Sequence, residues 1–437
     1  MKKEIGITLL GCGTVGGGVV NVLMQQRELL KQRTGIDFVL RHVVVKSREE
    51  YPPNHAELPM SLDANAAIDD PASDVIIELI GGTGVAFTFV ERALKLGKPV
   101  VTANKALLAV KGPELFKLAR EKNTCIAFEA SAGGGIPIID VLQRGLIANR
   151  VDALLGIVNG TCNFILSQMS QKGWSYEQAL KEAQAQGFAE ANPTMDVSGK
   201  DSLQKLTILA GLAFNVRIDE ADVHLEGIDK LNAADIKFAD ELGYVVKLLA
   251  IAARAEGDQI SLRVHPTLVH KTDLLAQVSG SFNAISFYGH ALGHALFYGR
   301  GAGRMPTASA VVSDVIGIAL GTTPAQFKAL NVFVDQTPKA PVLPFEKLMS
   351  RYYLRLTAKD QPGVLAQVTK VLGDQKISLA SFLQHESQGS DAVPLVLTTH
   401  LAREGAIQAA LKQIDALSPI TAPTVCLRIV DQPKEFA

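Results

Sequence analysis

Three acidic residues and a lysine lie close together in the sequence, at Glu190, Asp196, Asp201 and Lys205. A helix is expected over 199–214, and it would place Asp201 and Lys205 on one face because they are four residues apart. A lysine ammonium can stabilise a developing alkoxide and move its proton, and carboxylates can hold a substrate ammonium. Taken alone, the pair is more often a surface ion pair worth less than about 1 kcal/mol. The four residues together form a candidate catalytic site.

A glycine-rich turn follows the first apolar run of the chain. It has the GxGxxG pattern and contains Gly11, Gly13, Thr14, Val15 and Gly16. In such a turn the first glycine permits the tight bend, the second lets the backbone approach a pyrophosphate, and the third lets helix and strand pack closely. The phosphates then lie at the positive end of the helix. The strand–turn–helix context favours dinucleotide binding over an ordinary glycine turn.

The end of the second expected strand indicates which dinucleotide would bind. An NAD site has an acidic residue there, whereas this strand is followed by Lys46 and Arg48. Two cations suit a 2′-phosphate, so we predict a preference for NADP, with NAD still possible. The alternative is a solvated basic turn.

A second candidate site has the sequence EASAGGGI, from Glu129 to Ile136. One carboxylate and a backbone that can turn its carbonyl groups inward suit a hard cation with oxygen ligands. From the residues alone, a plain strand-to-helix turn is the more common explanation of such a pattern.

Two other patterns resemble functional sites but lack part of the chemistry. His290 and His294 have the spacing of a metal pair, but they are flanked by glycines and lie outside any HExxH frame. Cys162 resembles the nucleophile of a thioester-forming aldehyde dehydrogenase, but no histidine lies near it in the sequence to activate the thiol. A small buried residue is the simpler interpretation of Cys162.

The elements that must position these residues follow an α/β pattern over 1–150. Apolar strands are expected at 5–10, 38–45, 74–80, 99–102 and 124–128, with helices at 15–32, 87–96 and 114–122. Continuous apolar strands that alternate with helices indicate a parallel, doubly wound sheet. We therefore predict a Rossmann-type domain over 1–150, to which 300–320 returns.

The remainder divides into two further domains joined by a linker. Grouped strands and helices over 151–320 suggest an α+β catalytic and dimerisation domain with a mixed sheet. The proline-rich stretch 321–350 is expected to be a linker. The order of elements over 351–437 is βαββαβ.

Composition excludes several functions. Lys plus Arg number 43 against 44 Asp plus Glu, so no basic domain points to nucleic acid. No apolar run reaches the roughly 18 residues that a membrane span needs. Four widely spaced cysteines suggest reduced thiols and a cytoplasmic protein.

The segment GFAEANPTMDVSGKDSLQKLTILA resembles the signature of homoserine dehydrogenases. Further segments agree in the family's order: LLGCGTVGGGV, VTANKALLA, FEASAGGGIPII, GIVNGTCNFIL and GRGAGRMPTASAVVSD. The resemblance implies reversible NAD(P)H-dependent reduction of L-aspartate 4-semialdehyde to L-homoserine, on the route to threonine, methionine and isoleucine. The tail, with DQPGVL at 360–365, resembles an ACT regulatory domain.

The resemblance also implies residue roles. Lys205 would donate the proton, Glu190 and Asp201 would bind homoserine, and Asp196 would support them. Lys105 would lie beside cofactor and substrate, and Gly187 and Gly303 would approach the cofactor. A sodium ion would be ligated at Glu129, Ala132, Gly134 and Ile136. Threonine would bind the ACT domain as inhibitor, and a homodimer or homotetramer is expected. The rival functions are the thioester-forming dehydrogenase and a non-catalytic amino-acid sensor.

Overall fold

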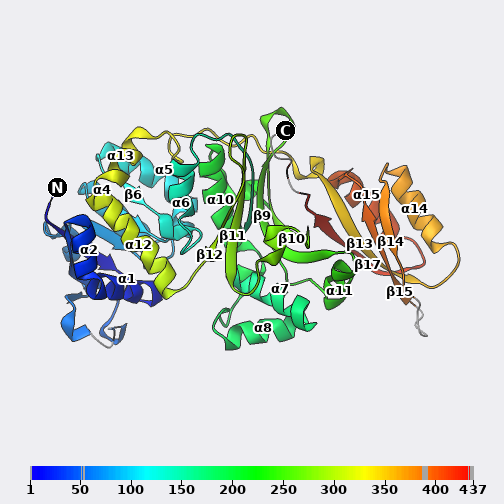
Figure 1. The fold of residues 1–437 in the computed structure, drawn as a ribbon, viewed down its shortest axis with the longest axis horizontal. Helices are drawn as coiled ribbons and strands as arrows, with labels where there is room; N and C mark the ends of the chain where they lie inside the picture. The colour runs from blue at the N-terminus through cyan, green and yellow to red at the C-terminus, as the bar shows by residue number, and fades with distance from the viewer. Residues whose placement is uncertain (1, 51, 53–54, 386–391, 432, 434–437) are drawn as a thin grey trace.

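The computed structural model describes residues 2–50, 52, 55–385, 392–431 and 433. Three parts follow one another along the longest axis of the molecule, from the N-terminal domain through a central domain to the C-terminal domain (Figure 1). This arrangement agrees with the fold class expected from the sequence.

The N-terminal domain has a six-stranded parallel sheet in the order β3-β2-β1-β4-β5-β6. Its strands are β1 (Glu4–Leu10), β2 (Asp37–Val44), β3 (Met60–Ser61), β4 (Val75–Glu78), β5 (Val100–Thr102) and β6 (Ile126–Ala127). Its helices are α1 (Thr14–Gln25), α2 (Arg27–Thr34), α3 (Ala64–Asp69), α4 (Val85–Lys95) and α5 (Lys105–Glu121). The strand order is that of a Rossmann fold. The single helix expected over 15–32 is two helices, separated at Gln26.

A later helix, α12 (Arg304–Ala319), returns to this domain and packs against α1 (Figure 1). A Cβ atom at Gly18 would lie 2.6 Å from the carbonyl oxygen of Arg304 and 2.9 Å from the Cβ of Ala308. The close approach of the two helices therefore requires a glycine in α1.

The central domain contributes β7 (Val151–Ile157), β8 (His224–Leu225), β9 (Tyr244–Arg254), β10 (Ile260–His270), β11 (Phe282–Gly289) and β12 (Gly293–Arg300). Its helices are α6 (Ile138–Asp140), α7 (Gly160–Lys172), α8 (Tyr176–Ala185), α9 (Thr194–Val197), α10 (Lys200–Phe214) and α11 (Ala233–Glu241). Antiparallel pairs predominate, but β8 pairs parallel with β10, so the sheet is mixed as expected. Strand β12 and helix α11 were not anticipated from the sequence.

Apart from the two-residue strand β16, the C-terminal domain has the βαββαβ order of an ACT domain. It comprises β13 (Met349–Lys359), α14 (Val364–Asp374), β14 (Leu379–Leu383), β15 (Ala392–Thr399), β16 (Ala402–Arg403), α15 (Glu404–Asp415) and β17 (Ile420–Ile429). Strand β17 pairs with β13 on one side and, over two residues, with β10 of the central domain on the other. The central and C-terminal sheets are therefore continuous through eleven strands.

Short turns complete the fold: η1 (Arg48–Glu50), η2 (His55–Glu57), η3 (Glu129–Ser131), the π-helix η4 (Val141–Gly145), η5 (Glu220–Asp222), η6 (Glu256–Asp258), η7 (Leu274–Gln277) and η8 (Phe345–Lys347). Among the described residues, no single helix is long and apolar enough to span a membrane. Only α12 and α13 (Thr322–Ala329), taken together across an 80° bend, reach that length and composition.

The stretch expected to be a linker is partly structured. It contains α13, and Phe327 and Phe333 stack on Phe116 of α5 with ring centroids 5.8 and 5.7 Å away. Because these rings are buried, the first part of the stretch belongs to the N-terminal core.

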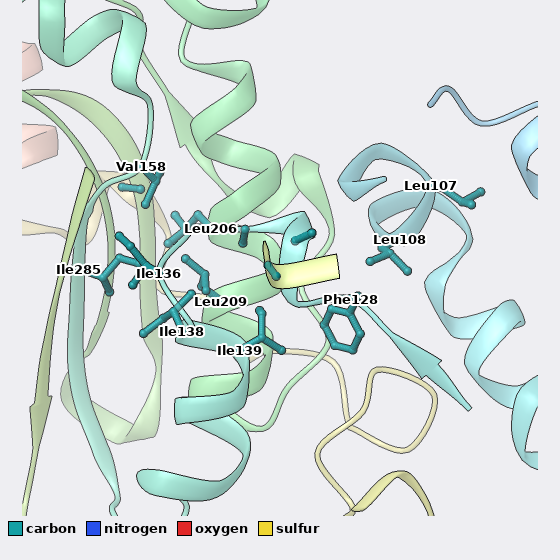
Figure 2. Packing of buried hydrophobic residues seen from close by; sticks show 14 of the residues in the cluster. Leu107, Leu108, Phe128, Ile136, Ile138, Ile139, Val158, Leu206, Leu209 and Ile285 are labelled. Atoms are coloured by element: carbon teal, nitrogen blue, oxygen red, sulfur yellow. The ribbon is translucent and has the colours of Figure 1, made fainter. Parts of the chain in front are cut away.

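A hydrophobic core joins the first two domains. Side chains from α5, from segment 136–139 and from α10 lie near one another, with Val158 and Ile285 on the side of the central sheet (Figure 2). The residues proposed for catalysis lie on two of these elements, with Lys105 on α5 and with Asp201 and Lys205 on α10.

Candidate active site

Asp201 and Lys205 form a buried ion pair at the start of α10. The Lys205 ammonium donates to Asp201 Oδ2 at 2.8 Å and to the Val158 carbonyl oxygen at 2.7 Å. The Lys105 ammonium, from the first turn of α5, lies 3.2 Å from Asp201 Oδ1. Asp201 and Lys205 are 8% and 9% exposed, so an exposed surface pair is the wrong interpretation. The structure thus brings three of the predicted residues together from two domains.

Asn159 organises this cluster and was not predicted as a site residue. Its side-chain amide donates to Asp196 Oδ1 at 2.7 Å and to Asp201 Oδ2 at 2.8 Å. Its Oδ1 caps α7 by accepting from the amide of Cys162 at 2.8 Å. The available signal was an asparagine followed by glycine directly after a strand, a pattern that favours a helix N-cap.

Burial and charge act on the two aspartates in opposite ways. Burial disfavours the charged form of Asp201, but the ammonium groups of Lys205 and Lys105 outweigh it and lower the pKa to about 2. Burial raises the pKa of Asp196, and the hydrogen bond from Asn159 only partly offsets it. Of the two aspartates, Asp201 is therefore the one held as an anion.

Glu190 and Gly187 lie on the exposed loop between α8 and α9. The backbone carbonyl of Glu190 accepts from the side chain of Gln184 at 3.1 Å. Within the described part of the chain, no hydrogen bond or ion pair joins the Glu190 carboxylate to Asp201 or Lys205. Gly187 has a φ of +73° and open space where a Cβ would be. The structure leaves both residues free to meet a ligand.

The glycine turn has the geometry that a dinucleotide requires. Gly11 has a φ of +95°, and a Cβ at Gly16 would lie 2.1 Å from the Gly11 carbonyl oxygen. Gly13, at the N-cap of α1, has no atom within 4 Å of a Cβ position. The helix start thus faces open space, and Thr14 and Val15 form its first turn. This arrangement fits a pyrophosphate.

A cavity extends from this turn to the end of β2. Lys46 lines it together with Gly11, Gly13, Val45 and other residues, namely Cys12, Val44, Glu50, Leu62, Ala64, Leu79, Ile80, Val85 and Phe89. The carboxylate of Glu50 accepts from the backbone amide of Lys46 at 3.2 Å. Arg48 is exposed on the following turn. The cation at 46 is placed beside the cavity, whereas Arg48 lies outside its lining.

The turn 129–136 differs from the expected cation site because the carboxylate of Glu129 is already hydrogen-bonded to the backbone. Both oxygens of the Glu129 carboxylate accept backbone hydrogen bonds, from Ile139 at 2.9 Å and Asp140 at 2.7 Å. The buried carbonyl groups of Ala132 and Gly134 accept no hydrogen bond from the described residues. Buried carbonyls need a partner, so they fit a cation better than the Glu129 side chain does.

The other members of this turn complete its environment. The Ile136 carbonyl accepts from Ile138 at 2.7 Å. Burial raises the pKa of Glu129 to about 7. A Cβ at Gly134 would lie 2.4 Å from the carbonyl oxygen of Gly301. Two residues later, Gly303 is the N-cap of α12 and has a φ of +121°. The turn therefore contacts the segment through which α12 returns to the first domain.

The two alternative patterns are not supported as sites. Strands β11 and β12 form a hairpin in which His294 bonds Ser286 at 3.0 Å, while His290 accepts from the Arg150 amide. No cluster of metal-ligating side chains occurs in the described ranges. Burial holds the pKa of the Cys162 thiol well above its usual range, and the thiol bonds the Asp196 carbonyl. A thiolate nucleophile is disfavoured there.

The fold and the site together define a dinucleotide-dependent oxidoreductase that carries an ACT domain. The family described as homoserine dehydrogenase matches residues 137–316, its NAD-binding domain matches 11–129, and the ACT domain matches 352–419. The chain belongs to the homoserine dehydrogenase family.

Known homoserine dehydrogenases are similar to this chain over nearly its full length. Homoserine dehydrogenases from Pseudomonas aeruginosa and Neisseria gonorrhoeae are 43% and 41% identical, covering 98% of this chain and 99% of theirs. The crystal structure of a homoserine dehydrogenase from Thiobacillus denitrificans has a TM-score of 0.92 at 42% identity, covering 98% of this chain and 99% of that one.

Proposed function

We propose that the enzyme reversibly reduces L-aspartate 4-semialdehyde to L-homoserine with NADPH, on the route to threonine, methionine and isoleucine. The observation that carries this proposal is the buried contact of Lys205 with Asp201, next to Lys105 from the N-terminal domain. The test is NADPH consumption by the purified chain with aspartate semialdehyde, and NADP reduction with homoserine. Absence of turnover in both directions would overturn the proposal.

The roles of the residues follow from their charges. The nicotinamide supplies the hydride. Lys205 gives a proton to the carbonyl oxygen of the semialdehyde as the alcohol forms, and its neighbour Asp201 holds the Lys205 side chain in place. Asp201 and Glu190 hold the substrate ammonium, and Asp196 supports Asp201 through Asn159. Lys105, which begins α5 of the N-terminal domain and contacts Asp201, would lie between the cofactor and the substrate.

The cofactor preference depends on the end of β2. Lys46 beside the cavity, with Arg48 on the next turn, supports recognition of a 2′-phosphate. The double change of Lys46→Ala and Arg48→Ala should raise the KM for NADPH far more than that for NADH. An equal change for both cofactors would contradict the NADP preference.

A sodium ion is proposed at the turn 129–136. The carbonyl oxygens of Glu129, Ala132, Gly134 and Ile136 would hold it, and it would brace the contact between the turn and Gly301. Thermal unfolding in sodium against tetramethylammonium chloride tests it. Sodium should raise the Tm in a saturable way, and equal Tm values would remove the ion from the proposal.

Regulation and assembly are proposed from the C-terminal domain. Gly363 has a φ of +87° and open space around its Cβ position, which suits an effector at the start of α14. We propose threonine as the inhibitor and a homodimer or homotetramer as the assembly. The four cysteines are free in the structure, which supports a reducing, cytoplasmic setting. Inhibition assays with threonine and sedimentation of the purified chain test the first two points.

A further inference from the structure

The buried Arg428 of β17 connects the ACT domain to the central domain through an ion-pair network. It is 3% exposed, and its guanidinium binds Glu404 of α15 through two nitrogens, at 2.7 and 2.8 Å. Its remaining nitrogen, Nη1, donates to Glu226 Oε2 of the central domain at 2.9 Å. The other oxygen of Glu226 bonds His224 at 2.7 Å.

Glu226 lies in the short segment 224–228, which packs directly against the segment 190–199, the substrate loop. The amide of Ile228 donates to the Val197 carbonyl oxygen at 2.8 Å. A Cβ at Gly227 would lie 2.3 Å from that oxygen, so the two backbones are in contact. Val197 immediately follows Asp196. The position of the segment 224–228 therefore constrains the backbone that carries the aspartate.

The backbone of Glu226 is also fixed to the sheet that the two domains share. Its amide donates to the Val264 carbonyl of β10 at 2.8 Å. Three residues further along β10, Thr267 pairs with Arg428. The side chain of Glu226 thus contacts β17 directly, and its backbone is bonded to β10, the strand that pairs with β17.

We propose that Arg428 and Glu226 are positioning residues through which the ACT domain sets the place of the substrate loop 190–199. The proposal rests on the function given above. When β17 shifts, Glu226 moves with it, and the contact of Gly227 with Val197 transmits the shift to Asp196 and, through Asn159, to Asp201. An effector bound to the ACT domain would act on substrate binding by this route.

A second contact between the same domains provides a matched control. Arg355 of β13 binds Asp235 of α11 through two nitrogens at 2.6 and 3.0 Å. Neither residue hydrogen-bonds the loop 190–199 in the described part of the chain. The pair therefore fastens the domains together without holding the substrate loop.

The experiment compares Arg428→Lys, Glu226→Gln and Arg355→Lys in the full chain. Lysine keeps the charge but loses the bidentate geometry at either arginine. The first two variants should raise the KM for homoserine by about tenfold, with small changes in kcat and in the KM for NADP. They should also speed amide hydrogen exchange over 194–199. The third variant should change neither quantity.

Each outcome decides one question. If the wild-type chain has no turnover, the proposed function is refuted. The positioning role is then tested by hydrogen exchange alone. An active wild type with unchanged KM and exchange in Glu226→Gln would overturn the proposal. Equal effects in all three variants would also overturn it, because loosened docking would then explain them. Should Arg428→Lys fail to fold, the half-exposed Glu226 still provides the test.

Discussion

Asp201 and Asp235 are two buried aspartates of the central domain, and each lies in the first turn of a helix. Asp201 is 8% exposed and is held by two lysines and the amide of Asn159. Asp235 is fully buried and accepts three hydrogen bonds, two from Arg355 and one from the Tyr353 hydroxyl at 2.9 Å. The two sites thus use the same anion with different cations.

The cation that pairs with each aspartate, lysine at Asp201 and arginine at Asp235, suits a different role. An ammonium is a compact charge on a flexible stem and can transfer a proton, whereas a guanidinium is planar, keeps its charge and binds a carboxylate in a fixed geometry. Lys105 is also partly exposed, at 29% of its side chain, so the Asp201 cluster is open on the side of the N-terminal domain. We infer that lysine partners mark the aspartate of the candidate active site and an arginine partner marks the structural one.

The largest expected effect is on turnover, in Lys205→Ala. Loss of the proposed proton donor should lower kcat by about 10²- to 10⁴-fold while NADPH still binds, because Lys205 contacts Asp201 and Val158 rather than the glycine turn. Stopped-flow turnover and NADPH fluorescence titration measure the two properties. Lys200→Ala, an exposed neighbour on α10, is the control. Near-normal turnover would remove Lys205 from the mechanism and end the contrast between the two aspartates.

The next effect is on stability, in Asp235→Asn. The largely buried guanidinium of Arg355 would lose the counter-charge of the fully buried Asp235, so the free energy of unfolding should fall by about 3 kcal/mol. The folded enzyme should keep near wild-type turnover at low temperature, since Asp235 is bonded to the ACT domain and not to the site. Urea unfolding and initial rates give the two numbers. A large loss of kcat with unchanged stability would show that Asp235 is functional.

The contrast also explains which parts of the site could be predicted from the sequence. Asp201 and Lys205 are four residues apart, so a helical pattern places them together. Asp235 meets Tyr353 and Arg355 across 118 and 120 residues, and no local pattern reports that pairing. Asn159 was missed for the same reason, because its contact with Asp201 spans 42 residues.

The fold was predictable where an element has a continuous local signal. Buried strands such as β1 and β4 and the βαββαβ tail carry one, and the structure has them. Strand β12 was missed because its residues are mostly half-buried or exposed. Helix α13 lies in a proline-rich stretch and is held by the packing of Phe327 on Phe116, a long-range contact. Tertiary contacts decided both cases.

A smaller effect concerns acid, in Asp201→Asn. The folded pKa of about 2 lies below the ordinary 3.8, so the charged carboxylate stabilises the fold above pH 3.8, and this stability is lost as the pH falls through about 2. The variant should therefore be less stable than the wild type by about 2 kcal/mol at pH 7, with the gap closing below pH 4. Urea unfolding at several pH values measures it. A gap independent of pH would show that the lysines do not stabilise the Asp201 charge.

The smallest effect tests the bridge between the acids, in Asn159→Ser. Serine still caps α7, but its single hydroxyl cannot donate to Asp196 and Asp201 together. We expect a rise of about tenfold in the KM for homoserine, the effect of losing one hydrogen bond to a charged group. The KM for NADP and the Tm should change little, whereas Asn159→Ala should also lower the Tm because it removes the cap. If serine left the KM for homoserine unchanged, Asn159 would be only a helix cap, and Lys205 and Lys105 alone would position Asp201.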